Sequence, residues 1–425
     1  MPTLPAFFAD GLRQVFRGGR LYWSWVAGLN VVVLVGIAFY WRQLDQGLIV
    51  TGMSDQVSWG VYIANFTYLV GIAAAAVMLV IPAYIFHRED VKHVVLMGEG
   101  MAVAAVIMSI LFVVVDLGRP ERIWHMIPLL GRLHLPASLL AWDVVVLTGY
   151  LVLNVTIPFY ILFRRYQGGE PRLRVYFPAV LISIGWAIAI HTVTAFLFSS
   201  NVARPFWHTA VLGPRFLASA FTSGPALIVL ALQVIGRKTP FKVQSSVIDL
   251  MALVTTVALQ INLFLLAAET FTDFYFRTEE VLAATYLYLG LNGATMLVPW
   301  IWSAIALEGS AAIILTIHPL RRRRVFLSIA CGLAIVGVWI EKGMGLVIPA
   351  FVPTPVGEVF EYAPTWAEVF VSLGIWALGL LVFTLLAKVA IAIELGTLRL
   401  GLDHRAGPDP REAEAYRGTG PDVAR

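Results

Sequence analysis

The stretch VVVDLGRPERIWH, residues 113–125, ends a long apolar run at an acid, Asp116. A glycine and a proline then stop the helix, and three basic or nearly basic side chains follow. A second apolar run opens further on with Trp142 and Asp143, so it carries an acid inside membrane-type sequence. Ionisable groups inside a membrane are costly and usually functional. The stretch therefore predicts membrane-spanning helices with a polar site at one end.

The composition extends this interpretation to the whole chain. Of 425 residues, 59% are hydrophobic and 13% are charged, against about 25% charged in soluble domains. The charges cluster between apolar runs of about 20–28 residues, enough to cross roughly 30 Å of hydrocarbon. We expect an all-α polytopic membrane protein and no soluble domain.

The apolar runs predict ten transmembrane helices. They cover residues 22–41, 58–86, 94–115, 137–163, 176–199, 208–235, 246–270, 288–317, 325–347 and 366–394. The apolar stretch 281–317 is too long for one straight helix, and Gly290, Gly293 and Pro299 are expected to break off an interfacial segment before the eighth span.

Basic residues predict the orientation. If the N-terminus is inside, the inner segments hold 22 of the 30 Lys and Arg residues. The positive-inside rule then favours an N-in, C-in topology with an even number of spans.

A single integral membrane domain, residues 1–425, is expected. Its predicted parts are a first helix and loop (22–57), a first four-helix bundle (58–199), a second four-helix bundle (206–347), a last helix (366–394) and a cytoplasmic tail (401–425). Phe66-Thr67 and Phe221-Thr222 occupy similar places in two spans of the same direction, which suggests a parallel repeat.

Helix geometry, at 1.5 Å per residue, gives the depth of each polar side chain. Asn65, Asp143 and His191 all fall about 9–12 Å below the outer edge. The residues predicted at or above that edge, as a charged lid, are Asp116, Arg119 and His125.

This outer layer suits a quinone headgroup. A His donates a hydrogen bond and a proton near neutral pH, and a nearby acid exchanges the proton. Asp143, His191 and His125 are the catalytic candidates; Asn65, Asp116, Arg119, Trp59, Tyr62 and Trp142 are the candidates for quinone binding. The alternatives are a structural bond between helices for Asp143 and His191, and a partner-facing role for His125. Arg119 is expected to pair with Asp116 or Asp143, or to be solvated.

A second polar set is predicted in the inner half of the membrane. It comprises Glu99, Asp249, Glu308 and Asn154. One interpretation is a proton path from the inner face. The other is a group of buried acids hydrogen-bonded to neighbouring Ser, Thr and Asn, and protonated by desolvation.

The chain offers few ligands for a cofactor. Cys331 is its single cysteine, which excludes an Fe–S cluster held by this chain alone. Of eight histidines only His191 lies clearly within a predicted span, so no haem is expected. Metal-ligand, phosphate-loop and nucleophile motifs are absent, no cleavable signal peptide is evident, and the pI of 9.2 gives no indication of nucleic acid binding. Electrons must come from a partner.

Three motifs together resemble the NrfD/polysulfide-reductase membrane-subunit family. They are SWGVYIANF (58–66), DLGRPER (116–122) and Trp142-Asp143. Ten spans are similar to the longer branch that includes DsrP, HmcC, the Qrc menaquinone reductase membrane subunit and the two large membrane subunits of alternative complex III.

The resemblance implies a quinone-reactive subunit without its own haem or Fe–S cluster, in a bacterial cytoplasmic (inner) membrane. Its implied partners are a ferredoxin-like Fe–S protein on the periplasmic face, with multihaem cytochrome c or molybdopterin-type subunits, and membrane lipids. Menaquinone is the implied substrate. Asn65, Asp116, Arg119 and Asp143 match by motif, whereas His125 and His191 rest on depth.

Two other functions stay open from sequence. A secondary transporter of an ion or small anion would use the same buried acids, but the polar layer is off-centre and the repeat parallel. A passive membrane anchor predicts that changes to these acids leave turnover unaltered.

Overall fold

A computed structural model describes residues 4–127, 130–276, 280–354 and 356–400. Over these residues the chain is helical, and the sole extended pairing is an isolated bridge between Leu291 and Ala294. The helices are α1 (Leu4–Val15), α2 (Arg20–Gln46), α3 (Val61–Ala74), α4 (Val77–Val80), α5 (Glu89–Lys92), α6 (Val95–Asp116), α7 (Leu139–Tyr166), α8 (Leu173–Ser199), α9 (Leu212–Lys238), α10 (Ser245–Phe276), α11 (Val281–Tyr288), α12 (Val298–Thr316), α13 (His318–Arg321), α14 (Arg324–Trp339), α15 (Gly345–Val347) and α16 (Trp366–Glu394). Short 3-10 or π turns are η1 (Leu48–Val50), η2 (Ile81–Ile85), η3 (Pro120–Met126), η4 (Pro205–Trp207), η5 (Ile340–Met344) and η6 (Pro349–Phe351).

Ten helices in the described part of the chain are long and apolar enough to cross a membrane, which confirms the predicted number and the all-α class. Two of them are composite. The second span continues from α3 through α4 and the π-turn η2, and the ninth continues from α14 through the π-turn η5 to Phe351.

The predicted break before the eighth span is also confirmed, but the span itself is shorter than expected. The segment before it forms the separate helix α11, and the turn that follows holds Gly290 and Gly293, both at positive φ. This conformation is nearly free of strain only for glycine. The spanning helix α12 therefore begins at Val298, with Pro299 in its first turn.

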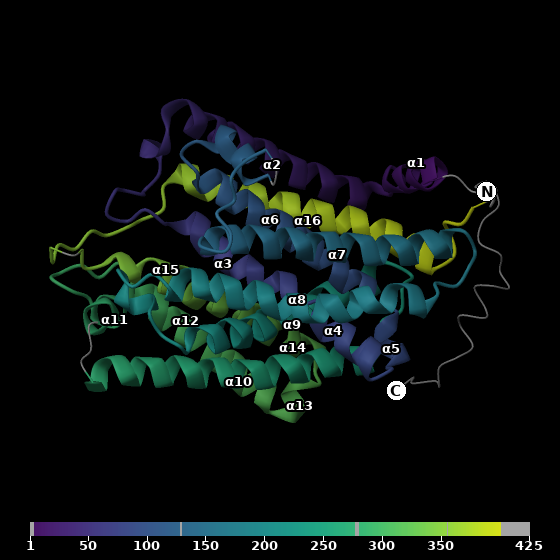
Figure 1. The fold of residues 1–425 in the computed structure, drawn as a ribbon. Coiled ribbons are helices and arrows are strands. Elements are labelled where there is room, and N and C mark those ends of the chain that lie inside the picture. The colour runs from purple at the N-terminus through teal and green to yellow at the C-terminus, as the bar shows by residue number, and fades with distance from the viewer. Residues whose placement is uncertain (1–3, 128–129, 277–279, 355, 401–425) are drawn as a thin grey trace.

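The spans lie roughly side by side along one long axis (Figure 1). In one group α3, α6, α7 and α8 pack together, and in another α9, α10, α12 and α14 pack together; α3 and α8 both contact α9. The first span, α2, packs mainly on α16, and α16 on α6. The division into two repeated bundles stays a prediction.

Small residues bring helices close where they cross. A Cβ on Gly36 of α2 would lie 2.7 Å from the Cα of Gly374 on α16, and a Cβ on Gly224 of α9 would lie 2.0 Å from the Cβ of Ala75. Close backbone approach of this kind favours helix association in lipid, where dispersion forces rather than hydrophobic burial hold helices together.

The two ends of the bundle differ. At one end, here called the η3 end, lie η1, η3, α11 and residues 352–354 and 356–365 (Figure 1). At the other, the α1 end, Phe7 of α1 packs against Tyr166 and Ile393, and Lys388 donates a 3.2 Å hydrogen bond to the Val15 carbonyl. Both α1 and the last turn of α16 thus lie at one end, as an even number of spans requires. Which end faces the cytoplasm stays a prediction.

Candidate functional site

Asp143 is held by a contact between α7 and α8. Ser138 caps the start of α7 by accepting a hydrogen bond from the Ala141 amide at 3.3 Å, which places Asp143 in the second turn. Asp143 is 2% exposed, and its carboxylate accepts a 2.6 Å hydrogen bond from the Thr194 hydroxyl. A buried carboxyl with one side-chain partner retains acceptor capacity for a ligand or a proton.

His191 lies on the same face of α8, three residues before Thr194. It is fully buried, and its Nδ1 lies 3.0 Å from the Ala187 carbonyl of its own helix. That contact makes Nδ1 the protonated nitrogen, which leaves Nε2 as an acceptor. Within the described residues Nε2 is buried without a hydrogen-bond partner. Such an orphan is uncommon in a folded core and calls for a functional explanation.

Asn65 has a different environment. Its Nδ2 donates to the Val61 carbonyl at 2.8 Å, and its Oδ1 accepts from the indoles of Trp339 at 3.0 Å and Trp376 at 2.9 Å. The amide thus ties α3 to α14 and α16. Its oxygen has both lone pairs occupied, whereas Nδ2 keeps a second N–H that can donate to a quinone carbonyl.

Tyr62, which is fully buried, and Asp116, which is partly buried, belong to a second polar group at the η3 end. Tyr62 donates to Gln43 at 2.7 Å, and Gln43 donates to the Val115 carbonyl at 2.6 Å. Asp116 and Glu368 lie within electrostatic range of Tyr62. Among the described residues the Asp116 Oδ1 is buried and has no hydrogen-bond partner.

Glu368 organises the loops beside this group. It is fully buried and accepts hydrogen bonds from Tyr362 at 2.6 Å and from the backbone amide of Gly52 at 2.7 Å, and it completes a capping box with Thr365 at the start of α16. Burial, with Glu368 nearby, raises the pKa of the Tyr362 phenol above its ordinary value. The phenol therefore stays protonated and a donor.

The aromatic candidates Trp59 and Trp142 lie in different environments. Trp59 is partly buried and stacks on Trp207 at 5.5 Å, with Phe198 and Phe351 at its edges. Trp142 is 38% exposed and donates to the Pro136 carbonyl at 2.9 Å. Trp59 thus faces the interior, whereas Trp142 faces the outer surface of the bundle.

Two residues of the predicted lid, Arg119 and His125, are exposed. The Arg119 guanidinium lies 3.5 Å from Glu121, with 74% of its side chain exposed, so it pairs with neither Asp116 nor Asp143. His125 is exposed and stacks on Trp124 at 3.8 Å. The structure therefore places these two side chains on a surface that a partner can reach.

The candidates for the proton path lie in three places. Glu99 is 3% exposed, and its Oε2 is buried without a partner among the described residues; Tyr150 is within electrostatic range. Asn154 donates to the Tyr150 carbonyl at 2.9 Å. Glu308, on α12, is fully buried and accepts from Asn262 at 3.1 Å. Asp249 is exposed on α10, and the structure groups it with none of these acids.

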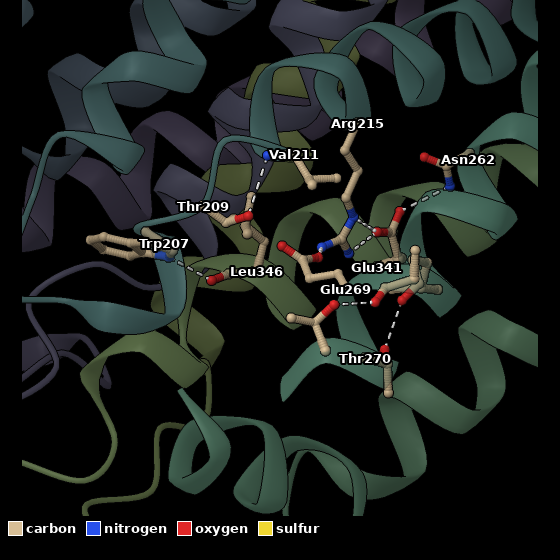
Figure 2. A network of polar contacts seen from close by, with 12 residues as sticks. Trp207, Thr209, Val211, Arg215, Asn262, Glu269, Thr270, Glu341 and Leu346 are labelled. Atoms are coloured by element: carbon tan, nitrogen blue, oxygen red, sulfur yellow. Dashed lines mark hydrogen bonds and ion pairs between the residues drawn. The ribbon is translucent and has the colours of Figure 1, made fainter. Parts of the chain in front are cut away.

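The structure also contains a larger buried ionic cluster, which is not predicted from the sequence. Arg215 of α9 donates through Nε to Glu341 of η5 at 2.9 Å, and its other nitrogens bond Glu341 and Glu269 of α10 (Figure 2). Asn262 donates to Glu341 at 3.3 Å as well as to Glu308, so one amide joins the two carboxylates. Lys342 is also buried and lies over the Phe216 ring.

A signal for this cluster is nonetheless present in the sequence. Arg215, Glu269, Glu341 and Lys342 all fall inside the predicted spans, where charges are costly. Their pairing depends on which faces of the helices meet. Because these spans are apolar nearly all the way around, the sequence pattern does not show which face of each helix is turned toward a neighbour. Among the described residues, no group of three or more His, Cys, Asp or Glu could hold a metal ion.

Over the described residues, the fold and the buried polar groups define a class: an all-α, multi-pass membrane protein that encloses acids, aromatic side chains and a His whose Nε2 has no hydrogen-bond partner. A family model described as "Polysulphide reductase, NrfD" matches residues 49–352, more than half of the chain. The chain belongs to the NrfD family.

The curated proteins that are similar to it include the following three. A putative membrane subunit of dimethyl sulfoxide reductase from Halobacterium salinarum is 25% identical over 86% of this chain and 90% of its own length. The Hdr-like menaquinol oxidoreductase integral membrane subunit of Archaeoglobus fulgidus is 27% identical over 58% of this chain and 60% of its own. The integral membrane subunit of menaquinone reductase from Nitratidesulfovibrio vulgaris is 23% identical over 86% and 90%.

Proposed function

We propose that this chain is the quinone-interacting integral membrane subunit of a respiratory redox complex. Membership of the NrfD family supports this function, as do relatives whose names are menaquinol oxidoreductase and menaquinone reductase membrane subunits. The structural observation that carries it is the buried, unpaired Nε2 of His191, one helical turn from the Thr194 that bonds Asp143.

The chemistry of this group fits a quinol. A quinol hydroxyl can donate to the unprotonated Nε2, and the acid on the facing helix can take or return the second proton. His191 and Asp143 are the proposed proton-exchanging groups, with Trp59 as part of the aromatic wall. Asn65, Asp116, Tyr62 and Trp142 stay proposed members of the site.

The exposed side chains of Arg119 and His125 support the proposal that a partner subunit binds at the η3 end. Arg119 and His125 lie on that end and are accessible, and the chain has one cysteine, so electrons must reach it from a redox subunit. We propose a ferredoxin-like Fe–S protein there, with cytochrome c or molybdopterin-type subunits beyond it. The proposed setting is the bacterial cytoplasmic membrane, with the η3 end on the periplasmic side.

Proton movement is a further part of this proposal. Glu99 with Asn154, and Glu308 with Asn262 and Glu341, are buried polar groups away from the proposed quinone site. They form two separate groups, whereas the sequence predicts one proton path through all of these residues, and the exposed Asp249 belongs to neither group. Transport of an ion or small anion stays an alternative that uses the same carboxylates.

The test is an inventory of the native complex with a turnover assay. The complex is purified from membranes through a tag on this chain, and its subunits, iron, haem and bound quinone are measured. Electron transfer with a soluble menaquinol analogue is then followed. Copurified Fe–S subunits, bound quinone and quinol-dependent turnover are expected. A homo-oligomer without quinone that moves an ion in liposomes would contradict the proposal.

A further inference from the structure

An apolar groove lies between α10, α11 and α12, outside the site proposed above. Its volume is about 810 Å³, within the range of roughly 300–1,000 Å³ usual for small-molecule sites. Leu266 and Ala267 of α10 line it, with Phe271 one turn further on and Trp302 on α12. Because α10 and α12 are membrane-spanning helices, a groove between them is accessible from the lipid.

Two hydroxyl groups stand in the wall of this groove. Thr270 and Tyr288 are hydrogen-bonded through their oxygens at 3.0 Å. The Thr270 hydroxyl also lies 2.8 Å from the Leu266 carbonyl, and since it has one hydrogen, Tyr288 supplies the donor between the two. The phenol oxygen then keeps lone pairs that can accept from a ligand. Trp302 holds this turn by donating to the Tyr288 carbonyl at 3.0 Å.

The buried ionic cluster lies directly behind these hydroxyls. Glu269 precedes Thr270 on α10 and bonds Arg215 (Figure 2). Arg215, Glu269 and Glu341 are all within electrostatic range of the Tyr288 phenol. An apolar slot with aromatic walls therefore ends at two hydroxyls that are backed by ionisable groups.

We propose that this groove is a lateral binding site for an isoprenoid quinol or quinone, with the headgroup at Thr270 and Tyr288 and the tail along α10 and α12. The inference rests on the proposed function and adds a site in a different group of helices. Aromatic rings suit a flat headgroup, and the phenol oxygen suits a quinol hydroxyl.

A phospholipid fits the groove less well. None of the described residues that line it is Lys or Arg, so a phosphate would have no cationic partner there. An acyl chain, in turn, would leave the hydroxyl pair without a polar ligand. A quinol satisfies both parts of the groove, because its ring carries hydroxyl groups and its tail is hydrocarbon.

The experiment uses the native complex and a photoreactive azido-menaquinone reduced to its quinol, with labelled peptides located by mass spectrometry. We expect label on α10 and on the segment 288–302. Ala267→Trp fills the groove and should reduce this label at least tenfold. Ile261→Trp is the matched control, since Ile261 is 48% exposed on the same helix and does not line the groove; its labelling should equal that of the wild type.

Tyr288→Phe gives a second, milder variant. It keeps the ring and removes the phenol oxygen, so labelling at half-saturation should need about fivefold more of the reduced probe, which loses the one hydrogen bond that its hydroxyl donates to that oxygen.

Three outcomes separate the possibilities. Groove label that menaquinone displaces and excess phospholipid does not displace supports the inference. Label elsewhere on the chain but not in the groove, or groove label displaced by phospholipid alone, overturns it and leaves the proposed function standing. If no part of the chain is labelled and the complex has no quinol-dependent turnover, both proposals fail together.

Discussion

The Thr194 hydroxyl lies 2.6 Å from a carboxylate oxygen of Asp143 and bridges α8 to α7 inside the bundle. The same hydroxyl lies 2.7 Å from the Ile190 carbonyl of its own helix, so its single hydrogen is divided between the two acceptors. An ionised Asp143 draws the hydrogen to itself, whereas a protonated Asp143 can donate to the Thr194 oxygen. The contact thus responds to the proton that Asp143 carries.

Thr194→Val should therefore reduce quinone-dependent turnover of the native complex about tenfold, because Asp143 loses its one side-chain donor. A buried acceptor left unpaired also costs about 1–3 kcal/mol of stability. Thr192→Val is the control: Thr192 is only partly buried on the same helix and bonds the Ile188 carbonyl. Equal turnover in the two folded variants would contradict a role for the Asp143 contact.

Arg215→Met should be strongly destabilising. It leaves the carboxylates of Glu269 and Glu341 without their cation inside the membrane, and breaking a buried pair costs about 3–5 kcal/mol. Thermal unfolding in detergent measures the loss. Arg119→Ala is the comparison, since a pair this exposed is worth at most about 1 kcal/mol. Unfolding of the two variants at the same temperature would contradict a stabilising role for the Arg215 ion pairs.

Gly36→Leu should loosen the first span. The added side chain would meet the backbone of Gly374 on α16, and overpacking typically costs about 1–3 kcal/mol. Gly28→Leu, on the same helix, is the matched control, because a Cβ at Gly28 would have no neighbouring atom within 4 Å. Faster proteolysis between α2 and α3 in Gly36→Leu alone is expected; the same rate in both variants would argue against this crossing.

The α5 loop at the α1 end provides a test with pH. The Arg88 side chain, together with the Ser246 hydroxyl of α10 at 2.7 Å, lowers the pKa of Asp90 from its ordinary value of 3.8 to about 2. A depressed pKa means that the contact stabilises the fold fully above about pH 4 and is lost as the pH falls through about 2.

The difference in Tm between wild type and Asp90→Asn should accordingly be constant from about pH 8 to 5 and shrink below about pH 4. Glu89→Gln is the control, because the Glu89 side chain is 73% exposed and its partner Lys92 lies on the same short helix. A difference that changes between about pH 6 and 8 would show that another group controls this loop.

Much of the fold follows from the sequence because the lipid solvent imposes simple rules. Span length and hydropathy predict ten helices, and Gly290, Gly293 and Pro299 predict the break between α11 and α12. The sequence also predicts that the seventh span ends near residue 270, yet α10 continues to Phe276. The last turns of α10 pack against α11 and form one wall of the groove.

The arrangement of polar side chains is harder to predict. Depth along a helix is a one-dimensional quantity, and it gives no rotation about the axis. Asn65 and Asp143 share a predicted depth, but the first faces Trp339 and Trp376 and the second faces Thr194. Depth alone likewise places Asp249 with the inner acids, whereas its helix face turns outward. Pairings such as Arg215 with Glu341 arise only when three helices are in place.

The most direct test of quinone chemistry in this chain is the turnover of His191→Phe. Phenylalanine keeps a ring of similar size and removes the unpaired Nε2, and the lost Nδ1 contact lies within one helix. The variant should assemble with a Tm equal to or above that of the wild type, because a buried orphan is removed. Quinol-dependent electron transfer through the native complex should fall at least a hundredfold. An assembled His191→Phe complex that oxidises or reduces quinone at the wild-type rate would contradict the account.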